Sequence, residues 1–304
     1  MKAPTGEQHV ITRGTARAVI TELAASLREL SVDGVDLVQS YPEHSLPPFG
    51  EGIVLMPWPN RVEDGRWQLD GAVQQLDLTE VERNNAIHGL LRNTPYRLVE
   101  RDAESVVLAA DVFPQHGYPF HLETTVRYAL VAQGIEVTHG VRNVGSGRAP
   151  VAVGTHPFLK IGGVPTDELT LVLNAATHFE VDARLNPIRE HDVEGTEWDL
   201  RAGRLVRDLE LDDAFGGVST VGGVSALLRA PDGREVRLLQ DERHGYLQAF
   251  ITREFPGAGT AIALEPMTAP ANAFNSGLGL QWLEPGAAWA VGWGIQYHGG
   301  IEGE

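Results

Sequence analysis

Asp-Gly pairs between segments of alternating polarity are the feature that most constrains how this chain folds. Three of these pairs are hairpin candidates: Asp33-Gly34, Asp70-Gly71 and Asp232-Gly233. Both central residues of a type I′ turn take positive φ angles, which Asp and Gly tolerate, and this turn joins two antiparallel strands. The sequence therefore predicts three β-hairpins. Their return strands are expected at 35–38, 73–78 and 235–239.

Other segments rich in β-branched and aromatic residues also predict strands, at 105–112, 122–130, 135–141, 169–173 and 246–251. A helix over 17–30, where Ala and Leu are frequent, is the alternative for one region, but this segment runs directly into the first Asp-Gly turn. No other segment keeps a 3.6-residue period over three turns. Glycine, at 34 of 304 residues, is dispersed without a repeat, and no Ser- or Pro-rich linker divides the chain. We expect a mainly β fold in which residues 1–304 form a single domain.

The charge balance bears on the classes of partner. The chain has 24 basic and 41 acidic side chains and a formal net charge of −17. Proteins that bind nucleic acid need clustered Lys and Arg to neutralise phosphates, so nucleic acid is not an expected partner. No window approaches 18 consecutive apolar residues, and a membrane protein is not expected. The first residues lack the apolar core of a signal peptide and there is no cysteine, so the expected location is the cytoplasm.

His156 is a candidate for proton transfer. It follows the apolar run 151–153 and Gly154, and it precedes Pro157. A residue before proline is restricted to extended conformations, so His156 should project from the end of a strand. Imidazole exchanges protons near pH 7, which makes histidine the commonest general acid or base. A hydrogen-bonded structural histidine at a turn is the alternative.

Glu265 is a second candidate, because a carboxylate stands where an apolar run, 261–264, meets Pro266. Burial raises the pKa of a glutamate above its usual value of about 4.3 and makes it a better base. The alternative is a structural glutamate that accepts hydrogen bonds from loop amides.

Three further residues have both a functional and a structural interpretation. His88 lies in a turn beside Gly89, where a lone histidine is more often structural. Arg61 follows Asn60, and its guanidinium can bind a substrate hydroxyl or an internal carboxylate. Trp58, between two prolines, can stack on a sugar face or fill a corner of the core.

Motifs for metal and nucleotide chemistry are missing from the sequence. The 11 histidines include no His-x-His and no His-Glu-x-x-His, and no cysteine accompanies them. There is also no Gly-x-x-x-x-Gly-Lys loop, no Gly-x-Ser-x-Gly elbow and no dinucleotide-binding fingerprint. We therefore do not expect a zinc or iron centre, and nucleotide and serine-hydrolase chemistries lose their usual support.

Taken together, in order and spacing, several segments resemble the aldose 1-epimerase (galactose mutarotase) family. They are GIVLMPWPNRVEDGRW at 52–67, NNAIHGLLR at 84–92, GTHPFL at 154–159, LDDAF at 211–215, ALEPMTAPANAFN at 263–275 and LEPGAAW at 283–289. The likeness extends over nearly the whole chain. It implies a large twisted antiparallel β-sandwich, which agrees with the mainly β prediction reached from the hairpins.

The resemblance also implies roles for particular residues. The family's catalytic histidine, in its Gly-x-His-Pro motif, corresponds to His156, and its catalytic glutamate before proline corresponds to Glu265. Its other site histidine corresponds to His88.

Sugar-binding roles are implied in the same way. The family's arginine after asparagine corresponds to Arg61, and its hydroxyl-binding aspartate corresponds to Asp212, although Asp213 leaves that register open by one residue. Asn60 and Trp58 are implied as residues that shape the pocket.

The activity implied is the interconversion of α and β anomers of a free hexose such as galactose or glucose, without a cofactor. Glu265 would remove the C1 hydroxyl proton while His156 protonates the ring oxygen. A hexose-6-phosphate mutarotase is the nearest alternative and would need a cationic pocket, for which Arg61, Arg83 and Arg92 are the available arginines. The sequence leaves the oligomeric state open.

Two further alternatives come from other functional classes. A non-catalytic sugar-binding protein would have no need of both His156 and Glu265. A glycosidase would use a pair of carboxylates, for which Asp212, Asp213 and Glu265 are available.

Overall fold

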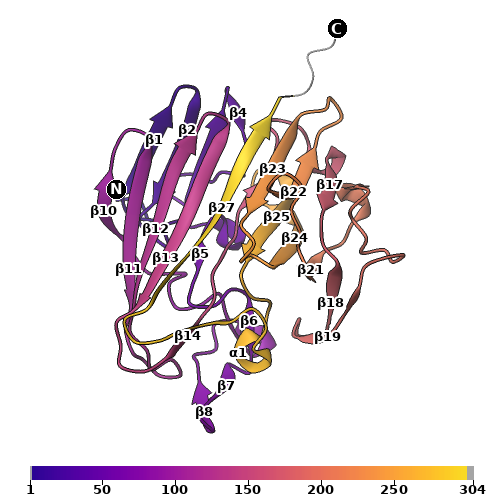
Figure 1. Ribbon diagram of the computed structural model, residues 1–304. Coiled ribbons are helices and arrows are strands. Elements are labelled where there is room, and N and C mark those ends of the chain that lie inside the picture. The colour runs from indigo at the N-terminus through magenta and orange to yellow at the C-terminus, as the bar shows by residue number, and fades with distance from the viewer. Residues whose placement is uncertain (1, 300–304) are drawn as a thin grey trace.

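Antiparallel strands make up most of the computed structural model, which describes residues 2–299 (Figure 1). The largest sheet has nine strands, in the order β10-β11-β12-β13-β27-β23-β22-β17-β20. Their bounds are β10 Arg97–Arg101, β11 Ser105–Val112, β12 Leu122–Val131, β13 Gly134–Asn143, β27 Ala288–His298, β23 Glu235–Gln240, β22 Val224–Arg229, β17 Thr170–Leu173 and β20 Arg204–Leu205.

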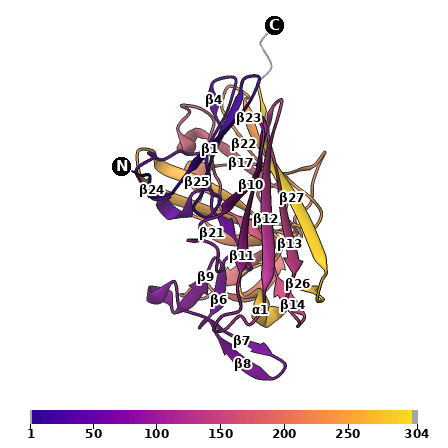
Figure 2. The same ribbon diagram turned by 90° about the vertical axis from the view of Figure 1, so that its left-hand side faces the viewer.

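A second sheet has eight strands, in the order β19-β18-β21-β24-β25-β15-β5, with β16 also paired to β25. Their bounds are β19 Pro187–Asp192, β18 Thr177–Val181, β21 Asp212–Gly216, β24 Tyr246–Phe255, β25 Gly259–Met267, β15 Gly154–Thr155, β5 Val54–Leu55 and β16 Phe158–Leu159. Turned by 90°, the molecule shows β24 and β25 in a layer on one side of the fold and β13 and β27 in a layer on the other (Figure 2). This arrangement confirms the predicted antiparallel β-sandwich.

Smaller sheets and short helices complete the fold. A four-stranded sheet contains β1 Gln8–Arg13, β2 Ala16–Thr21, β3 Leu27–Val32 and β4 Val35–Asp36. Three strand pairs are β6 Arg61–Glu63 with β9 Asn85–Ile87, β7 Arg66–Leu69 with β8 Ala72–Gln75, and β14 Ala149–Val151 with β26 Gln281–Leu283. The α-helix α1 covers Ala273–Ser276, and 3₁₀ turns lie at Pro48–Gly50, Val81–Arg83, Thr166–Glu168 and Val206–Asp208.

Two of the three predicted hairpin turns have the expected backbone. Asp33 and Gly34 have φ angles of 52° and 76°, and Asp70 and Gly71 have φ angles of 50° and 81°. The segment considered as a helix, 17–30, instead forms most of the β2–β3 hairpin.

The type I′ prediction is wrong for the third hairpin, between β22 and β23. There Gly233 has a φ of 86° but Asp232 is not in the left-handed region, and the Gly233 amide donates to the Ala230 carbonyl at 3.0 Å. Pro231 explains the difference, because its ring fixes φ near −65° and so places a type I geometry one residue earlier.

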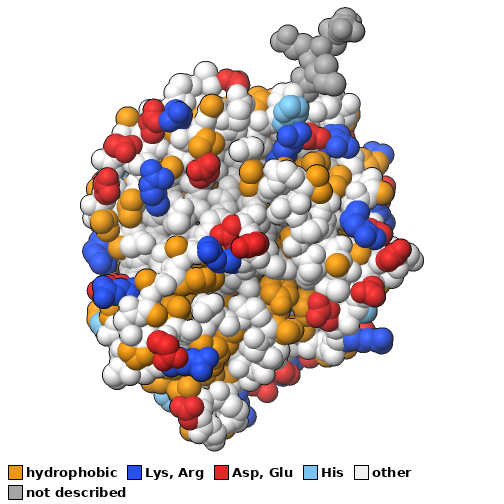
Figure 3. Space-filling model, in the orientation of Figure 1, with side chains coloured by type: hydrophobic (Ala, Val, Ile, Leu, Met, Phe, Trp, Pro, Cys, Tyr) orange, Lys and Arg blue, Asp and Glu red, His pale blue; other side chains and the backbone are white. Residues whose placement is uncertain are grey.

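The core lies between the layers. Along β12 and β13 buried and exposed residues alternate, as expected when one face of a sheet packs inward and the other meets solvent. Trp67, Tyr118, Tyr128 and Phe215 are among the largest fully buried side chains. The face seen in Figure 3 carries acidic and basic side chains interspersed over the sheet. Over residues 2–299, no helix is long and apolar enough to cross a membrane.

Candidate active site

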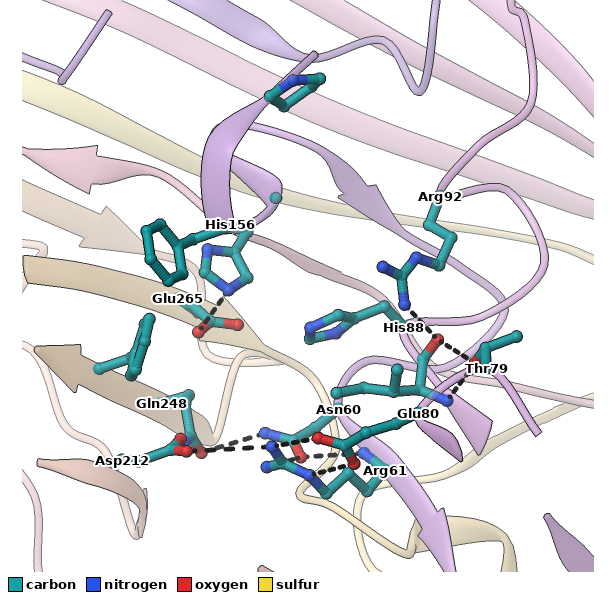
Figure 4. Close-up of a pocket in the computed structure, with 15 residues that line it drawn as sticks. Asn60, Arg61, Thr79, Glu80, His88, Arg92, His156, Asp212, Gln248 and Glu265 are labelled. Atoms are coloured by element: carbon teal, nitrogen blue, oxygen red, sulfur yellow. Dashed lines mark hydrogen bonds and ion pairs between the residues drawn. The ribbon is translucent and has the colours of Figure 1, made fainter. Parts of the chain in front are cut away.

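Polar side chains from distant parts of the chain line one cavity of about 440 Å³ (Figure 4). Its polar lining residues are Asn60, Arg61, Thr79, Glu80, His88, Arg92, His156, Asp212, Gln248 and Glu265. A cavity of this volume lies in the range of small-molecule sites. Six of the seven residues singled out from the sequence are therefore brought to one place.

One wall of the cavity is a face of the eight-stranded sheet. In the register of β24 with β25, Gln248 is directly opposite Glu265, and in that of β21 with β24, Asp212 is opposite Phe250. Directly paired residues, and residues two apart on one strand, point to the same face of a sheet. The register thus brings Asp212, Gln248, Phe250 and Glu265 together.

His156 leaves this sheet at the end of β15, as its position before Pro157 predicted. The Gly52 amide donates to the His156 carbonyl at 2.8 Å, and the His156 amide donates to the Ile53 carbonyl at 3.2 Å. Beyond Pro157, the buried carboxylate of Glu51 accepts the Phe158 amide at 2.9 Å. Backbone contacts on both sides of Pro157 therefore fix the segment that carries the imidazole.

The Nε2 atom of His156 lies 3.2 Å from Oε1 of Glu265, and the two residues are 5% and 2% exposed. Burial raises the pKa of Glu265 well above its usual value, and the nearby Asp212 adds to this while Arg61 opposes it. Burial lowers the pKa of His156 to about 4. Oε2 of Glu265 and Nδ1 of His156 are buried without a hydrogen-bond partner among residues 2–299. The structure thus holds a close acid–base pair at the cavity wall.

Arg61 both lines the cavity and forms an internal ion pair. Its Nε and Nη2 atoms donate to the two carboxylate oxygens of Glu80 at 2.9 and 3.0 Å, and Nη2 lies 3.9 Å from Oδ2 of Asp212. The side-chain Nδ2 of Asn60 donates to Oε1 of Gln248 at 3.1 Å, and Nε2 of Gln248 donates to Oδ1 of Asp212 at 2.8 Å. These contacts form a connected polar surface beneath the cavity.

His88 is held beside Arg61 by strand pairing. Arg61 is opposite Ile87 in the β6–β9 pair, and the His88 amide donates to the Asn60 carbonyl at 2.9 Å. His88 has a φ of 65°, and its ring centroid lies 5.4 Å from that of His156 at a near-perpendicular angle. Burial, with His156 and two arginines nearby, lowers the pKa of His88 well below its usual value.

Trp58 is the predicted site residue that does not line the cavity. It is 3% exposed and packs against Phe274 and Tyr118, with ring centroids 5.3 and 6.3 Å away. It supports the adjoining Pro57–Arg61 segment from within the core, so the sugar-stacking interpretation is not supported by its position.

The structure also separates the two adjacent aspartates. Asp212 faces the cavity, whereas Asp213 lies 2.7 Å from Nε2 of His178. Successive residues of a strand point to opposite faces, so only one of the pair can face the cavity.

Sequence reasoning missed Glu80, Gln248 and Phe250. Gln248 had a weak signal, since it is a polar residue within the otherwise apolar predicted strand 246–251. Glu80 had none, because its position beside Arg61 depends on the pairing of β6 with β9. Among residues 2–299, no group of three or more His, Asp or Glu side chains is placed to hold a metal ion.

Comparisons with known proteins give a family and a curated relative, each over nearly the whole chain. The family model described as aldose 1-epimerase matches residues 7–296. The Escherichia coli K12 protein YihR is 32% identical over 283 residues, which are 93% of this chain and 90% of that protein.

Solved structures show the same fold. A putative aldose 1-epimerase from Escherichia coli K12 matches with a TM-score of 0.83 and 17% identity, over 96% of this chain and 99% of the other. A GalM/aldose epimerase homologue from C. elegans matches with a TM-score of 0.84 and 17% identity, over 96% and 99%. The galactose 1-epimerase of Lactobacillus acidophilus NCFM matches with a TM-score of 0.79 and 19% identity, over 96% and 94%.

Proposed function

Because the chain belongs to the aldose 1-epimerase family and is therefore an isomerase, we propose that it interconverts the α and β anomers of a hexose by acid–base ring opening. The observation that carries this proposal is the buried contact of 3.2 Å between His156 Nε2 and Glu265 Oε1 on the wall of a cavity. Acid–base catalysis needs a proton donor and an acceptor within hydrogen-bond reach of the reacting atoms.

Ring opening requires two proton transfers. The Glu265 carboxylate takes the proton of the C1 hydroxyl while His156 gives a proton to the ring oxygen, and the bond between C1 and the ring oxygen breaks. The open-chain aldehyde then rotates about the C1–C2 bond. On reclosure, His156 recovers a proton from the attacking C5 hydroxyl and Glu265 returns one to the C1 oxygen.

The pair keeps a single proton throughout this cycle. In the resting pair burial favours the proton on Glu265, and it passes across the 3.2 Å contact to His156 for ring opening; in the aldehyde complex it is on Glu265 again. Burial of both groups disfavours removal of this proton, which would leave a buried anion, and addition of a second, which would leave a buried cation. The site therefore needs no proton exchange with solvent during turnover.

The polar surface around the pair is suited to holding the sugar. Glu80 fixes the guanidinium of Arg61, and Gln248 fixes Asp212, so both present oriented groups to sugar hydroxyls. We assign hydroxyl binding to Arg61, Asp212 and Asn60, and a hydrogen bond to the ring oxygen or a hydroxyl to His88. General acid and general base assistance each contribute about 10²–10⁴-fold, and positioning adds to this.

Free galactose and glucose are the first substrates to test, by polarimetry of the freshly dissolved α anomers. The proposal predicts a rotation that reaches its equilibrium value faster with the protein than in buffer. A glycosidase would instead release new reducing ends from oligosaccharides, and a binding protein would accelerate nothing. Absence of acceleration with every free, phosphorylated and acidic hexose would refute the proposed function.

A further inference from the structure

The two arginines of the cavity differ in their partners. Arg61 is neutralised by the paired contacts with Glu80 and by Asp212 at 3.9 Å. Arg92 has no carboxylate within 4 Å in the part of the chain that the structure describes; its Nη1 donates only to the Ile87 carbonyl, at 3.4 Å. Its Nε atom is buried and has no hydrogen-bond partner among the described residues. The cavity thus contains one cation that the protein leaves unpaired.

Such a cation is unfavourable without a ligand. Burial lowers the pKa of Arg92 from its usual value, and Glu80 opposes this from a distance. A guanidinium partly removed from water and left unpaired loses hydration that a charge-assisted hydrogen bond would replace. An anionic group bound at Arg92 would supply that bond.

The position of Arg92 indicates which part of a sugar it would meet. In Figure 4, Glu265 and Arg92 lie on opposite sides of the cavity, with His88 between them. A hexose with C1 at Glu265 and His156 can extend its exocyclic carbon, C6, toward the far wall. C6 lies outside the pyranose ring, so an acidic group there leaves ring opening unimpeded.

The other charges of the cavity limit the charge of that group. Glu80, Asp212 and Glu265 line the same space, and Arg92 is the one cavity guanidinium without a carboxylate partner among residues 2–299. A dianionic phosphate would bring a second negative charge among these carboxylates without a second free cation to balance it. A monoanion, such as a carboxylate or a sulfate ester, matches the single unpaired charge.

We infer that the preferred substrate is a hexose with a monoanionic group on its exocyclic carbon, bound through Arg92. This inference rests on the proposed function and narrows it from hexoses in general to acidic hexoses. Arg92 is a specificity-determining residue in this account, and the ring-opening groups stay the same.

The first test compares kcat/KM of the wild-type protein for anomer exchange of glucose, glucuronate, glucose 6-sulfate and glucose 6-phosphate, followed by NMR. We expect at least one monoanion to exceed glucose by about tenfold or more, and to exceed the phosphate. Catalysis of glucose exchange with no gain for either monoanion would refute the inference and leave the proposed function standing. A phosphate preferred over both monoanions would also refute it, and no acceleration of any sugar would refute the proposed function itself.

The second test uses Arg92→Gln, with Arg142→Gln as a control that removes an exposed arginine far along the sequence. Loss of a charge-assisted hydrogen bond should lower the ratio of kcat/KM for the preferred monoanion to that for glucose by about 10- to 100-fold. Arg92→Lys should retain part of the ratio, and Arg142→Gln should leave it unchanged. Equal losses on both sugars in Arg92→Gln would contradict a role in selectivity. If Arg92→Gln does not fold, the wild-type kcat/KM values for the four sugars and the ratio measured with Arg92→Lys still test whether Arg92 selects a monoanion.

Discussion

Two side chains with opposite requirements carry the proposed chemistry. His156 and Glu265 are in contact and buried, so both lose hydration in their charged forms. Burial therefore disfavours the cationic form of His156 and the anionic form of Glu265. Ring opening moves the shared proton from one group to the other without adding charge to the site. Groups that interact this closely titrate as a pair, so the pH dependence belongs to the pair.

The pH profile of kcat/KM follows from this arrangement. Burial lowers the pKa of His156 to about 4, from the usual 6.5, so a second proton enters the pair only near pH 4. Burial raises the pKa of Glu265, so the last proton leaves only well above the usual glutamate range. Activity should therefore fall near pH 4, where a second proton enters the pair, and fall again at the higher pH at which the last proton leaves. A loss of activity on acidification that is centred near pH 6.5, the usual value for histidine, would contradict the shared-proton account.

The sequence was informative about which residues form the site and less so about their contacts. The order and spacing of the motifs predicted that His156 and Glu265 belong to one site, and both residues line the cavity. For Arg61, the interpretations as a pocket residue and as an ion-pair residue both hold, because its planar guanidinium binds Glu80 along one edge and still faces the cavity. Trp58 could not be placed, since an aromatic residue between prolines suits a sugar face and a core equally.

At the scale of elements, local turn chemistry was predictable and long-range pairing was not. Asp33-Gly34 and Asp70-Gly71 determine their own turns. By contrast, the short strands β6 and β9, which bring Arg61 beside His88, are only three residues each and gain their stability from tertiary contacts. Glu80 enters the site through this pairing, which is why no local pattern revealed it.

The turn after β9 depends on a glycine that has no room for a side chain. Gly89 has a φ of 73°, and a Cβ atom there would lie 2.2 Å from the Met56 carbonyl oxygen. Gly71 has a φ of 81°, and among residues 2–299 no heavy atom beyond its own chain neighbours lies within 4 Å of the same position. Left-handed strain alone costs about 1–2 kcal/mol. Gly71→Ala should lower the free energy of unfolding by about that amount, and Gly89→Ala by more, with loss of activity through displacement of His88.

Urea unfolding of the two variants, with anomer exchange measured beside it, checks this expectation. Because the two substitutions have the same chemistry and similar φ angles, the difference between them isolates the backbone clash. Equal destabilisation, with activity retained in Gly89→Ala, would show that the loop moves away without effect on the site.

At the scale of the whole molecule, the sandwich brings together residues far apart in the sequence. Asn60 and Glu265 are more than 200 positions apart and line one cavity, because the β5, β15 and β25 strands are neighbours in one sheet. The alternation of polar and apolar residues along the strands predicted the sheets and their buried faces. The order of strands within each sheet depends on the whole fold and was not predicted. The single-domain organisation of residues 1–304 stays a prediction, and one cooperative unfolding transition would support it.

Acid stability should depend on a histidine in the core, away from the cavity. His139 is 1% exposed and accepts a hydrogen bond from the Trp293 indole at 3.0 Å. Burial lowers the pKa of His139 to about 3 from 6.5. The unfolded chain therefore takes up a proton as the pH falls below 6.5 while the folded protein does not, so stability present above pH 6.5 is lost on acidification.

His139→Gln retains an acceptor for Trp293 and removes the titrating group. Between pH 6.5 and 4, it should lose about 2–3 kcal/mol less unfolding free energy than the wild type, since each pKa unit corresponds to about 1.4 kcal/mol. His116→Gln, at an exposed position, is the control and should follow the wild type. Parallel curves for wild type and His139→Gln in urea titrations at each pH would contradict the assignment.

The central claim is that Glu265, paired with His156, opens the sugar ring, and polarimetry of Glu265→Gln tests it most directly. Glutamine keeps the size and one oxygen acceptor of the side chain but cannot take a proton. We predict that wild-type protein accelerates the rotation change of a freshly dissolved α anomer and that folded Glu265→Gln is slower by about 10²–10⁴-fold. A variant with the wild-type rate would remove Glu265 from the mechanism and contradict the account.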